Sequence, residues 1–242
     1  MAKKSGIGGR FYFGGFDLSG DVLTLDTVAG ARTVLEVTGL DKSAVERILA
    51  KTSGEIGVTV AFNDATGQNH PAYKGLPTTD VIAMYCQSNV VGDAVAMLLS
   101  KQINFDWSRG ADGSLIGSVQ CLSNTAPLEW GTTVIILTTV SSTGDSASQD
   151  NGGSSSAGAA AVFQCTAFSG TDYTAILQDS SNNSTFETLI SFTQITAVNK
   201  AERKTVTGTV DRYTRVNHSG TFTSVDVIVA IRRGTSDDAD AY

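Results

Sequence analysis

The sequence predicts a mainly-β protein: a β-sandwich or barrel with one flanking helix, followed by a second, C-terminal antiparallel β-sandwich. Three observations lead to this prediction. Most segments alternate apolar and polar residues with a period of two, which is typical of strands with one buried face. The 242 residues include 25 Gly but only 3 Pro, which indicates many turns. A single stretch early in the chain has the helical period instead.

The first β pattern begins after a Gly-rich arm at residues 1–10. Two strands are predicted at residues 21–28 and 32–39, separated by a turn at the "AGA" of 29–31. The arm lacks the apolar run of a signal peptide, and no stretch approaches the roughly 20 apolar residues of a membrane helix. We therefore expect a soluble protein made in the cytoplasm.

The helix is predicted over residues 41–51. Ser43 and Glu46 have the spacing of a capping box, with Asp41 as an alternative cap. An apolar stripe at helical spacing follows, and the "TSG" of 52–54 ends it. The stripe consists of Leu40, Val45, Ile48 and Leu49.

From residue 55 the period switches to two, which predicts a strand with one covered face. One set of alternate residues is apolar: Ile56, Val58, Val60 and Phe62. The other set is small or polar: Glu55, Gly57, Thr59 and Ala61. We expect the helix to pack on the apolar side of this strand.

Further strands are predicted at 81–86, 113–121 and 132–139, with a turn at the "GADG" of 110–113. Residues 92–108 fit either a strand or a helix, and a strand is preferred. Between the strand that begins at residue 55 and the strand at 81–86, residues 63–79 are expected to form a long polar loop with two prolines. Loops of this length in compact domains usually serve a function or stay mobile.

A domain boundary is predicted at residues 141–160, a Gly/Ser-rich segment with the composition of a flexible tether. The first domain then covers 11–140 and the second 161–234, before an acidic tail at 235–242. Strands of the second domain are predicted at 161–168, 173–180, 184–192, 204–210, 212–218 and 224–233. The last alternates cleanly except for Ile228.

Few residues indicate chemistry. The formal net charge of −7 and the pI near 4.7 argue against a surface that binds nucleic acid, because such binding depends on Lys and Arg. His70 and His218 have no Cys, Asp or Glu at metal-ligand spacing, and both are expected on the surface. No GxSxG or GxxxxGK motif occurs. The sequence predicts no catalytic, cofactor or metal site, and three unpaired, buried thiols at Cys86, Cys121 and Cys165.

The pattern resembles a known family. The segments "DLSGDV", "VTGLDKSAVERI" and "GEIGVTVAFN" resemble the entry of the major tail (tail tube) proteins of long-tailed phages that infect actinobacteria. Residues 102–124 resemble the core hairpin of these proteins. Residues 173–189 and 201–234 resemble an accessory β-sandwich found in phage tail proteins.

The resemblance implies a virion protein, not an enzyme, that forms stacked and usually hexameric rings around a channel for DNA ejection. Glu55, Gly57, Thr59 and Ala61 would line the lumen, past which genomic DNA and the tape measure protein move without specific binding. Loop 63–79 and the N-terminal arm at 1–10 would pair with subunits in adjacent rings, and the candidate contacts in the loop are Gly67, His70, Tyr73 and Lys74. Other tail proteins would bind the ends of the tube.

Two alternatives stay open. The chain could be a virion surface or decoration protein whose second sandwich binds glycans on the host. It could also be an enzyme whose site is assembled from distant residues, His70 and His218 among them.

Overall fold

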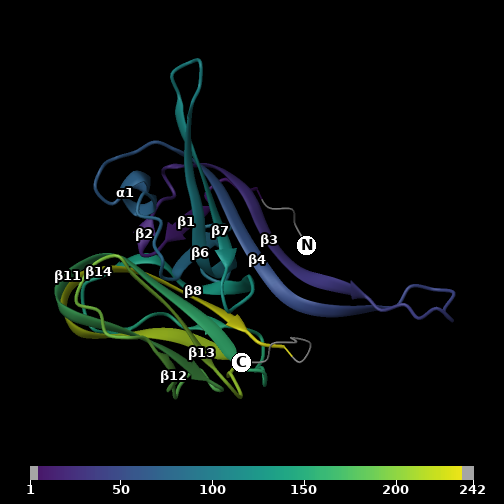
Figure 1. Cartoon of the computed structure of the whole chain (residues 1–242). Helices are drawn as coiled ribbons and strands as arrows, with labels where there is room; N and C mark the ends of the chain where they lie inside the picture. Colours follow the sequence, from purple (N-terminus) through teal and green to yellow (C-terminus); the bar gives the residue numbers. More distant parts are fainter. Residues whose placement is uncertain (1–4, 236–242) are drawn as a thin grey trace.

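The computed structural model describes residues 5–235, and it confirms the mainly-β class (Figure 1). The expected acidic tail and the first four residues of the expected arm lie outside the described residues, apart from Thr235. Within them, no helix is long and apolar enough to cross a membrane. The elements are β1 (Arg10–Phe13), β2 (Phe16–Asp17), β3 (Val22–Glu36), β4 (Arg47–Ala61), α1 (Asn69–Tyr73), β5 (Val81–Cys86), β6 (Ala94–Arg109), β7 (Leu115–Ser123), β8 (Glu129–Val140), β9 (Gly144–Asp145), β10 (Gln149–Asp150), β11 (Ala159–Ser180), β12 (Glu187–Ser191), β13 (Lys200–Val206) and β14 (Tyr213–Arg233).

The first half of the chain forms a sandwich of two layers. One layer is a four-stranded antiparallel sheet in the order β3, β4, β7 and the second half of β6. The other, which we call the middle layer, contains β1, β2, β5 and the first half of β6. The core between them includes Ile56, Val58 and Val60, as their alternation predicts. Phe11, Phe13 and Tyr73, rather than a helix at 41–51, cover that apolar face.

The middle layer is buried on both faces. On its far side, Tyr12, Met84 and Met97 pack against Val162 of β11 and Ile228 of β14. Ile228 interrupts the alternation of β14 because that strand also has two apolar faces. The other face of β14 points into the core of the second sandwich. The order of layers therefore runs from the four-stranded sheet, through the middle layer, to the second sandwich.

Two long strands build most of the second sandwich. β11 and β14 pair along almost their whole length and bend together, so that their two halves face each other across one core (Figure 1). At the bend, Gly220 has a φ of 121°, and a Cβ there would lie 2.6 Å from the carbonyl oxygen of Asp172. Only glycine allows this close approach without strain.

β8 joins the two halves of the chain into one sheet. Its first residues pair with β6, and the rest of the strand pairs with β14. Gly131 lies where these pairings meet, and a Cβ there would be 2.3 Å from the carbonyl oxygen of Ile231. The predicted domain division at 141–160 stays a prediction, but the sheet itself is not interrupted there.

The predicted helix at 41–51 is wrong. Residues 37–46 form the tip of a β-hairpin, and β4 begins at Arg47. Leu40, Ile48 and Leu49 are all exposed, so nothing among residues 5–235 covers the stripe that an amphipathic helix would bury. The backbone amides of the hairpin are instead satisfied by pairing, as at Leu35 and Ile48. Among the described residues the one helix is α1, which lies in the segment expected to be a loop.

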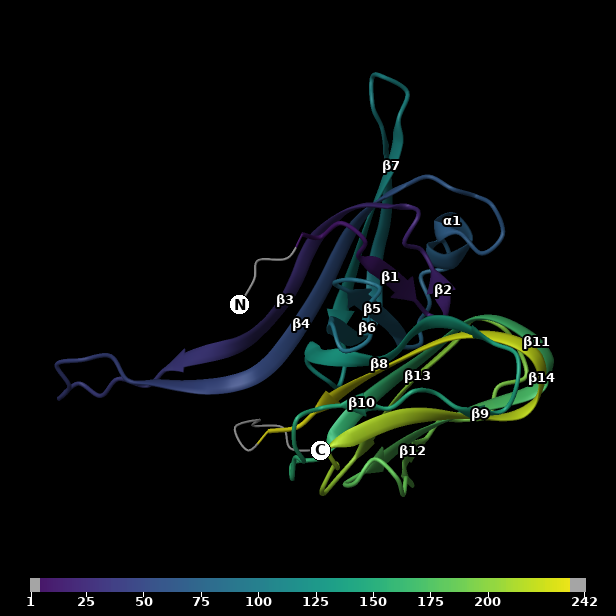
Figure 2. The ribbon, with the colours of Figure 1, turned by 180° about the vertical axis from the view of Figure 1, so that it is seen from behind.

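Three other expectations also need correction. The turn at 29–31 is absent, because β3 continues through it. Two predicted pairs of strands are each one bent strand. Residues 161–168 and 173–180 both belong to β11, and residues 212–218, from Tyr213 onward, and 224–233 both belong to β14. The tether is not free: β9 and β10 pair with β14 (Figure 2). By contrast, the strand preferred for 92–108 and the turn at 110–113 are confirmed.

One buried ion pair fixes the second sandwich to the first. The Arg203 guanidinium on β13 donates two hydrogen bonds to the Glu129 carboxylate on β8, at 2.7 and 2.8 Å. The Glu129 side chain is 1% exposed. Nearby, the Gly15 amide donates to the buried Gln164 side chain at 2.8 Å. The two sandwiches are thus connected by directional bonds as well as by apolar contact.

We expect Arg203→Ala to lower the free energy of unfolding by about 3–5 kcal/mol, because it leaves the buried Glu129 carboxylate without its main cation. Urea denaturation followed by circular dichroism measures this change. The matched control is Arg212→Ala, which breaks the exposed pair with Asp150 and should leave the midpoint nearly unchanged. Equal effects of the two substitutions would contradict the structural role of the buried pair.

Candidate assembly surface

The outer face of the four-stranded sheet is polar and exposed. Residues that pair across adjacent strands point to the same side of a sheet, so the register defines this face. It consists of four cross-strand rows, which we call the polar face: Thr24, Thr59, Ser118 and Asp106; Thr27, Gly57, Gln120 and Asn104; Ala29, Glu55, Leu122 and Lys101; and Ala61, Ile116 and Ser108.

Acidic groups predominate on the polar face. The Asp26 carboxylate, at a bulge of β3, accepts hydrogen bonds from the hydroxyls of Thr24 at 2.6 Å and Thr59 at 2.7 Å. Glu55 accepts from the Gln120 amide, and Asp106 accepts from the Asn104 amide at 2.7 Å. The one cation of the four rows, Lys101, forms an ion pair of 2.8 Å with Asp80. The face therefore presents carboxylates held in place by neighbouring polar groups.

The four residues predicted to line a lumen all belong to the polar face. Glu55, Thr59 and Ala61 are half-buried. Gly57 is buried beneath Thr27, and a Cβ on it would lie 3.6 Å from the Thr27 Cβ. The sequence analysis missed Asp26 and Asp106. The alternation of Thr24 and Asp26 with Leu23 and Leu25 was a signal that could have indicated the first.

This sheet has two unpaired edges among the described residues. β3 pairs with β4 alone along its 15 residues. In β6, pairing with β5 ends at Ser100, and residues 101–109 pair only with β7. An unpaired edge exposes a row of backbone N–H and C=O groups that can pair with another chain. The sheet is therefore open on both sides.

A long hairpin of β3 and β4 extends from the sheet, and we call it the arm from here on; it is distinct from the N-terminal residues 1–10. The far ends of β3 and β4 form a hairpin that projects well away from both sandwiches (Figure 1). Val34 pairs with Leu49, and Leu35 pairs with Ile48, so both faces of the arm carry apolar side chains. These four side chains are 47–61% exposed. A contiguous apolar hairpin that no other part of residues 5–235 covers is typical of a contact surface for another chain.

The residues predicted to contact adjacent rings lie in different environments. Lys74 is exposed, and Gly67 is half-buried at a turn with a φ of 83°. Tyr73 is fully buried against Phe13 and Phe105, so its role as a contact residue is wrong. Burial also raises the pKa of Tyr73 well above its usual value.

Both histidines were expected on the surface, and the structure places His70 at a half-buried position and His218 at a buried one. The His70 ring is half-buried and packs against Phe62 at a centroid distance of 5.0 Å and against Phe105 at 5.8 Å. His218 is 6% exposed and lies on β14. The first stands on α1 in the first sandwich and the second in the core of the second sandwich. The structure does not bring the two residues together in one site.

The thiols are placed as predicted. Cys86, Cys121 and Cys165 are free and buried. Burial raises the pKa of each to about 12, so these thiols stay protonated and are poor nucleophiles at neutral pH. Within residues 5–235, no group of three His, Cys, Asp or Glu side chains could hold a metal ion.

Comparisons with solved structures find similar chains in a gene transfer agent virion and among phage proteins. No family model and no curated protein sequence matches the chain. A chain of the virion of a native gene transfer agent particle is similar over 44% of this chain and 82% of its own, with 12% identity and a TM-score of 0.34. The Dit protein of phage SPP1, a hub of the adsorption apparatus, is similar over 93% of this chain and 99% of its own, with 13% identity and a TM-score of 0.34. A chain of the phage p2 baseplate is similar over 93% and 98%, with 8% identity and a TM-score of 0.35. A likeness at these scores does not assign a function to this chain.

Proposed function

We propose that this chain is a structural, non-catalytic virion protein of a phage, and that its copies form stacked rings of the tail tube through which genomic DNA is ejected. The observation that carries the proposal is the four-stranded sheet with two unpaired edges and an acidic outer face. The resemblance of the sequence to tail tube proteins supports it independently.

The number and direction of the strands suit a ring. In the order β3, β4, β7, β6 every neighbour is antiparallel, so β3 and β6 at the two edges run in opposite directions. When copies are related by rotation about an axis along the strands, β6 of one copy lies antiparallel to β3 of the next. Each joint then continues the ladder, and the head-to-tail contact closes into a ring without leaving an edge.

The size of such a ring suits DNA. Six copies, the number that the resemblance implies, contribute about 24 strands spaced about 4.8 Å apart, which gives a barrel about 37 Å across between backbones before strand tilt widens it. With the polar face turned inward, this bore accepts a duplex together with its lining side chains. Carboxylates and hydroxyls predominate on the lining, and its one cation in the four rows, Lys101, is paired with Asp80. Phosphates therefore find few cationic partners, and DNA can slide past without specific binding.

The arm formed by β3 and β4, together with loop 63–79, would connect adjacent rings. The arm has apolar side chains on both faces, so it suits a position between two other copies rather than on the outside of one. Exposed Lys74 and the neighbouring turn at Gly67 are available for contact in the same assembly. The tape measure protein would occupy the bore before ejection, and other tail proteins would bind the tube ends.

We expect the substitutions Val34→Thr, Leu35→Thr, Ile48→Thr and Leu49→Thr together to abolish assembly of the purified protein into tubes. Each buried side chain of this size contributes roughly 1.5–3 kcal/mol, so the association should weaken by at least about a thousandfold. Sedimentation velocity and negative-stain electron microscopy measure the loss of tubes.

The fold of the isolated subunit should survive these changes, since the arm contacts neither core. Val90→Thr with Val198→Thr is the matched control, because both residues are exposed but lie off the arm. Tubes that form normally from the arm variant would refute a role for the arm, and a monomeric wild-type protein under all conditions would refute the proposed function.

A second prediction concerns the lining. We expect Asp26→Lys, Glu55→Lys and Asp106→Lys together to give tubes of normal length but particles with at least about tenfold fewer plaques, because lysines on the polar face bind phosphates during ejection. Complementation of a phage that lacks this protein measures both quantities. The neutral set Asp26→Asn, Glu55→Gln and Asp106→Asn should have a smaller effect.

Glu187→Lys, on the exposed side of the second sandwich, is the control for charge alone. Normal plaque numbers with the lysine set, in tubes shown to contain it, would mean that the polar face does not line the DNA channel.

A further inference from the structure

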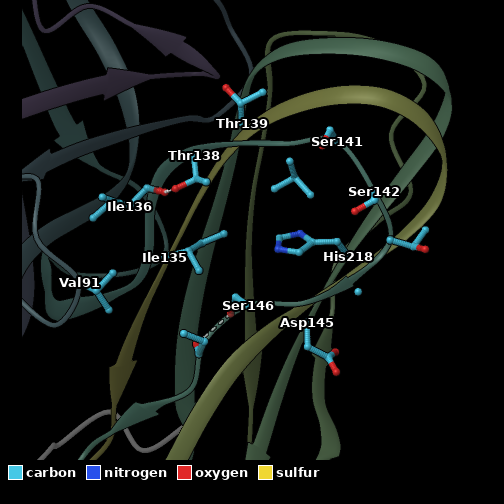
Figure 3. A pocket seen from close by; sticks show the side chains of 14 residues that line it. Val91, Ile135, Ile136, Thr138, Thr139, Ser141, Ser142, Asp145, Ser146 and His218 are labelled. Atoms are coloured by element: carbon cyan, nitrogen blue, oxygen red, sulfur yellow. Dashed lines mark hydrogen bonds between the residues drawn. The ribbon is translucent and has the colours of Figure 1, made fainter.

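The second sandwich contains a cavity of about 460 Å³ beside β14 (Figure 3). The second half of β8 and the segment 141–147 form its walls, and the imidazole of His218 reaches between them. The segment is held over β14 by pairing of Gly144 with His218 and of Asp145 with Asn217. The volume falls within the range of about 300–1,000 Å³ that is typical of small-molecule sites.

The hydrogen bond of Nδ1 orients His218. The Tyr173 hydroxyl lies 2.7 Å from this nitrogen, and Tyr173 is fully buried. Burial lowers the pKa of His218, against the effect of Asp145, so the neutral imidazole is favoured. The Tyr173 hydroxyl has no other partner among the described residues, so the tautomer that satisfies both groups is the one in which this hydroxyl donates to Nδ1. Nε2 then carries the proton.

This Nε2–H group has no protein acceptor within residues 5–235, and the ring that carries it reaches into the cavity (Figure 3). Four hydroxyls of the walls also have no hydrogen-bond partner there: Thr139, Ser141, Ser142 and Thr143. Those of Thr138 and Ser146 instead donate to backbone carbonyls. The cavity thus presents one fixed donor and several hydroxyls that can both donate and accept.

The charges of the cavity select against ionic ligands. No Lys or Arg lines it, so an anion would have no cationic partner. Its one carboxylate, Asp145, already pairs with Arg215 at 3.0 Å and accepts from Asn217 at 2.6 Å, which leaves little for a cation. An apolar ligand would leave the His218 donor and the hydroxyls unpaired. A neutral ligand rich in hydroxyl groups satisfies all of them.

We propose that this cavity is a binding site for a sugar, a mono- or disaccharide unit, with His218 Nε2 donating to a sugar hydroxyl and the hydroxyls of the 139–143 segment completing the contacts. The sugar can be free or part of a glycan. The site lies away from the polar face and the arm, so this proposal does not depend on ring assembly.

Saturation-transfer difference NMR on the purified full-length protein tests the proposal, since it works for a monomer and for large assemblies. The probes are the methyl glycosides of glucose, galactose, mannose and N-acetylglucosamine, and maltose, at millimolar concentration. We expect transfer to at least one probe, with weak affinity, because the cavity offers no large aromatic ring for a sugar to stack on. A polysaccharide that contains the bound sugar distinguishes a glycan from a free ligand.

Two variants locate the site. Ser142→Leu fills the cavity and leaves the bond between His218 and Tyr173 intact, so transfer should disappear while the fold persists. His218→Phe should weaken binding by about tenfold or more, because the Nε2 donor to the sugar is lost. Ser184→Leu, an exposed serine on another loop, is the matched control and should bind normally. Absence of transfer to every probe, or transfer that persists in Ser142→Leu, would overturn the proposal.

Discussion

The unpaired edges of the four-stranded sheet are the constraint on which the rest of the molecule depends. Backbone N–H and C=O groups along β3 and the second half of β6 need partners, and this chain supplies none in its described part. A protein can protect an edge with bulges, charges or covering elements. β3 has three register shifts along its pairing with β4, which twist it locally. They do not cover it, and in the proposed ring a second chain would pair with it.

The layers follow from that constraint. The polar face can point to solvent only because its opposite side is covered by the middle layer, which in turn needs cover on its own far side. β14 supplies that cover, and its own second face then requires the bent pair of β11 and β14 to enclose a core. The second sandwich is therefore attached to the side of the middle layer that faces away from the polar face. In a ring with the polar face inward, it lies on the outside.

The sequence predicted what depends on local alternation, and it failed where contacts distant in the chain decide the structure. Ile56, Val58 and Val60 alternate with the four polar-face residues, and the structure keeps that register. The spacing of Leu40, Val45, Ile48 and Leu49 is helical only if a surface is present to receive the stripe. In the arm no such surface exists, and pairing of β3 with β4 prevails over the helical pattern. The deviation of Ile228 from alternation was a correct signal of a second buried face, but its partner on β11 cannot be read from one strand.

The candidate sites show the same limit. Glu55 and Thr59 could be assigned to an exposed face from one strand, whereas Asp26 and Asp106 join them only through the pairing of separate strands. His218 looked like a turn residue because the bend of β14 at Gly220 resembles a turn in sequence. Its burial depends on Tyr173, 45 residues away, and on the segment 141–147 that closes the cavity. A composition rich in Ser and Gly predicted a mobile tether at 141–160, whereas in the structure the hydroxyl side chains of its first residues line the cavity beside His218.

The rigid connection between the two sandwiches links the cavity to the proposed assembly. Arg203 with Glu129, Gly15 with Gln164, and the shared strand β8 hold the second sandwich in one orientation. Every copy in a ring would then carry its cavity at the same height and angle on the outside. A single sugar site of this kind binds with low affinity. When copies are regularly spaced and the glycan repeats, each contact after the first is intramolecular. The overall affinity can then rise by about 10²–10⁴-fold. Such a gain requires fixed spacing, and the buried ion pair and the uninterrupted sheet provide it. The same bonds that complete the fold of one subunit would thereby set the geometry of a multivalent surface.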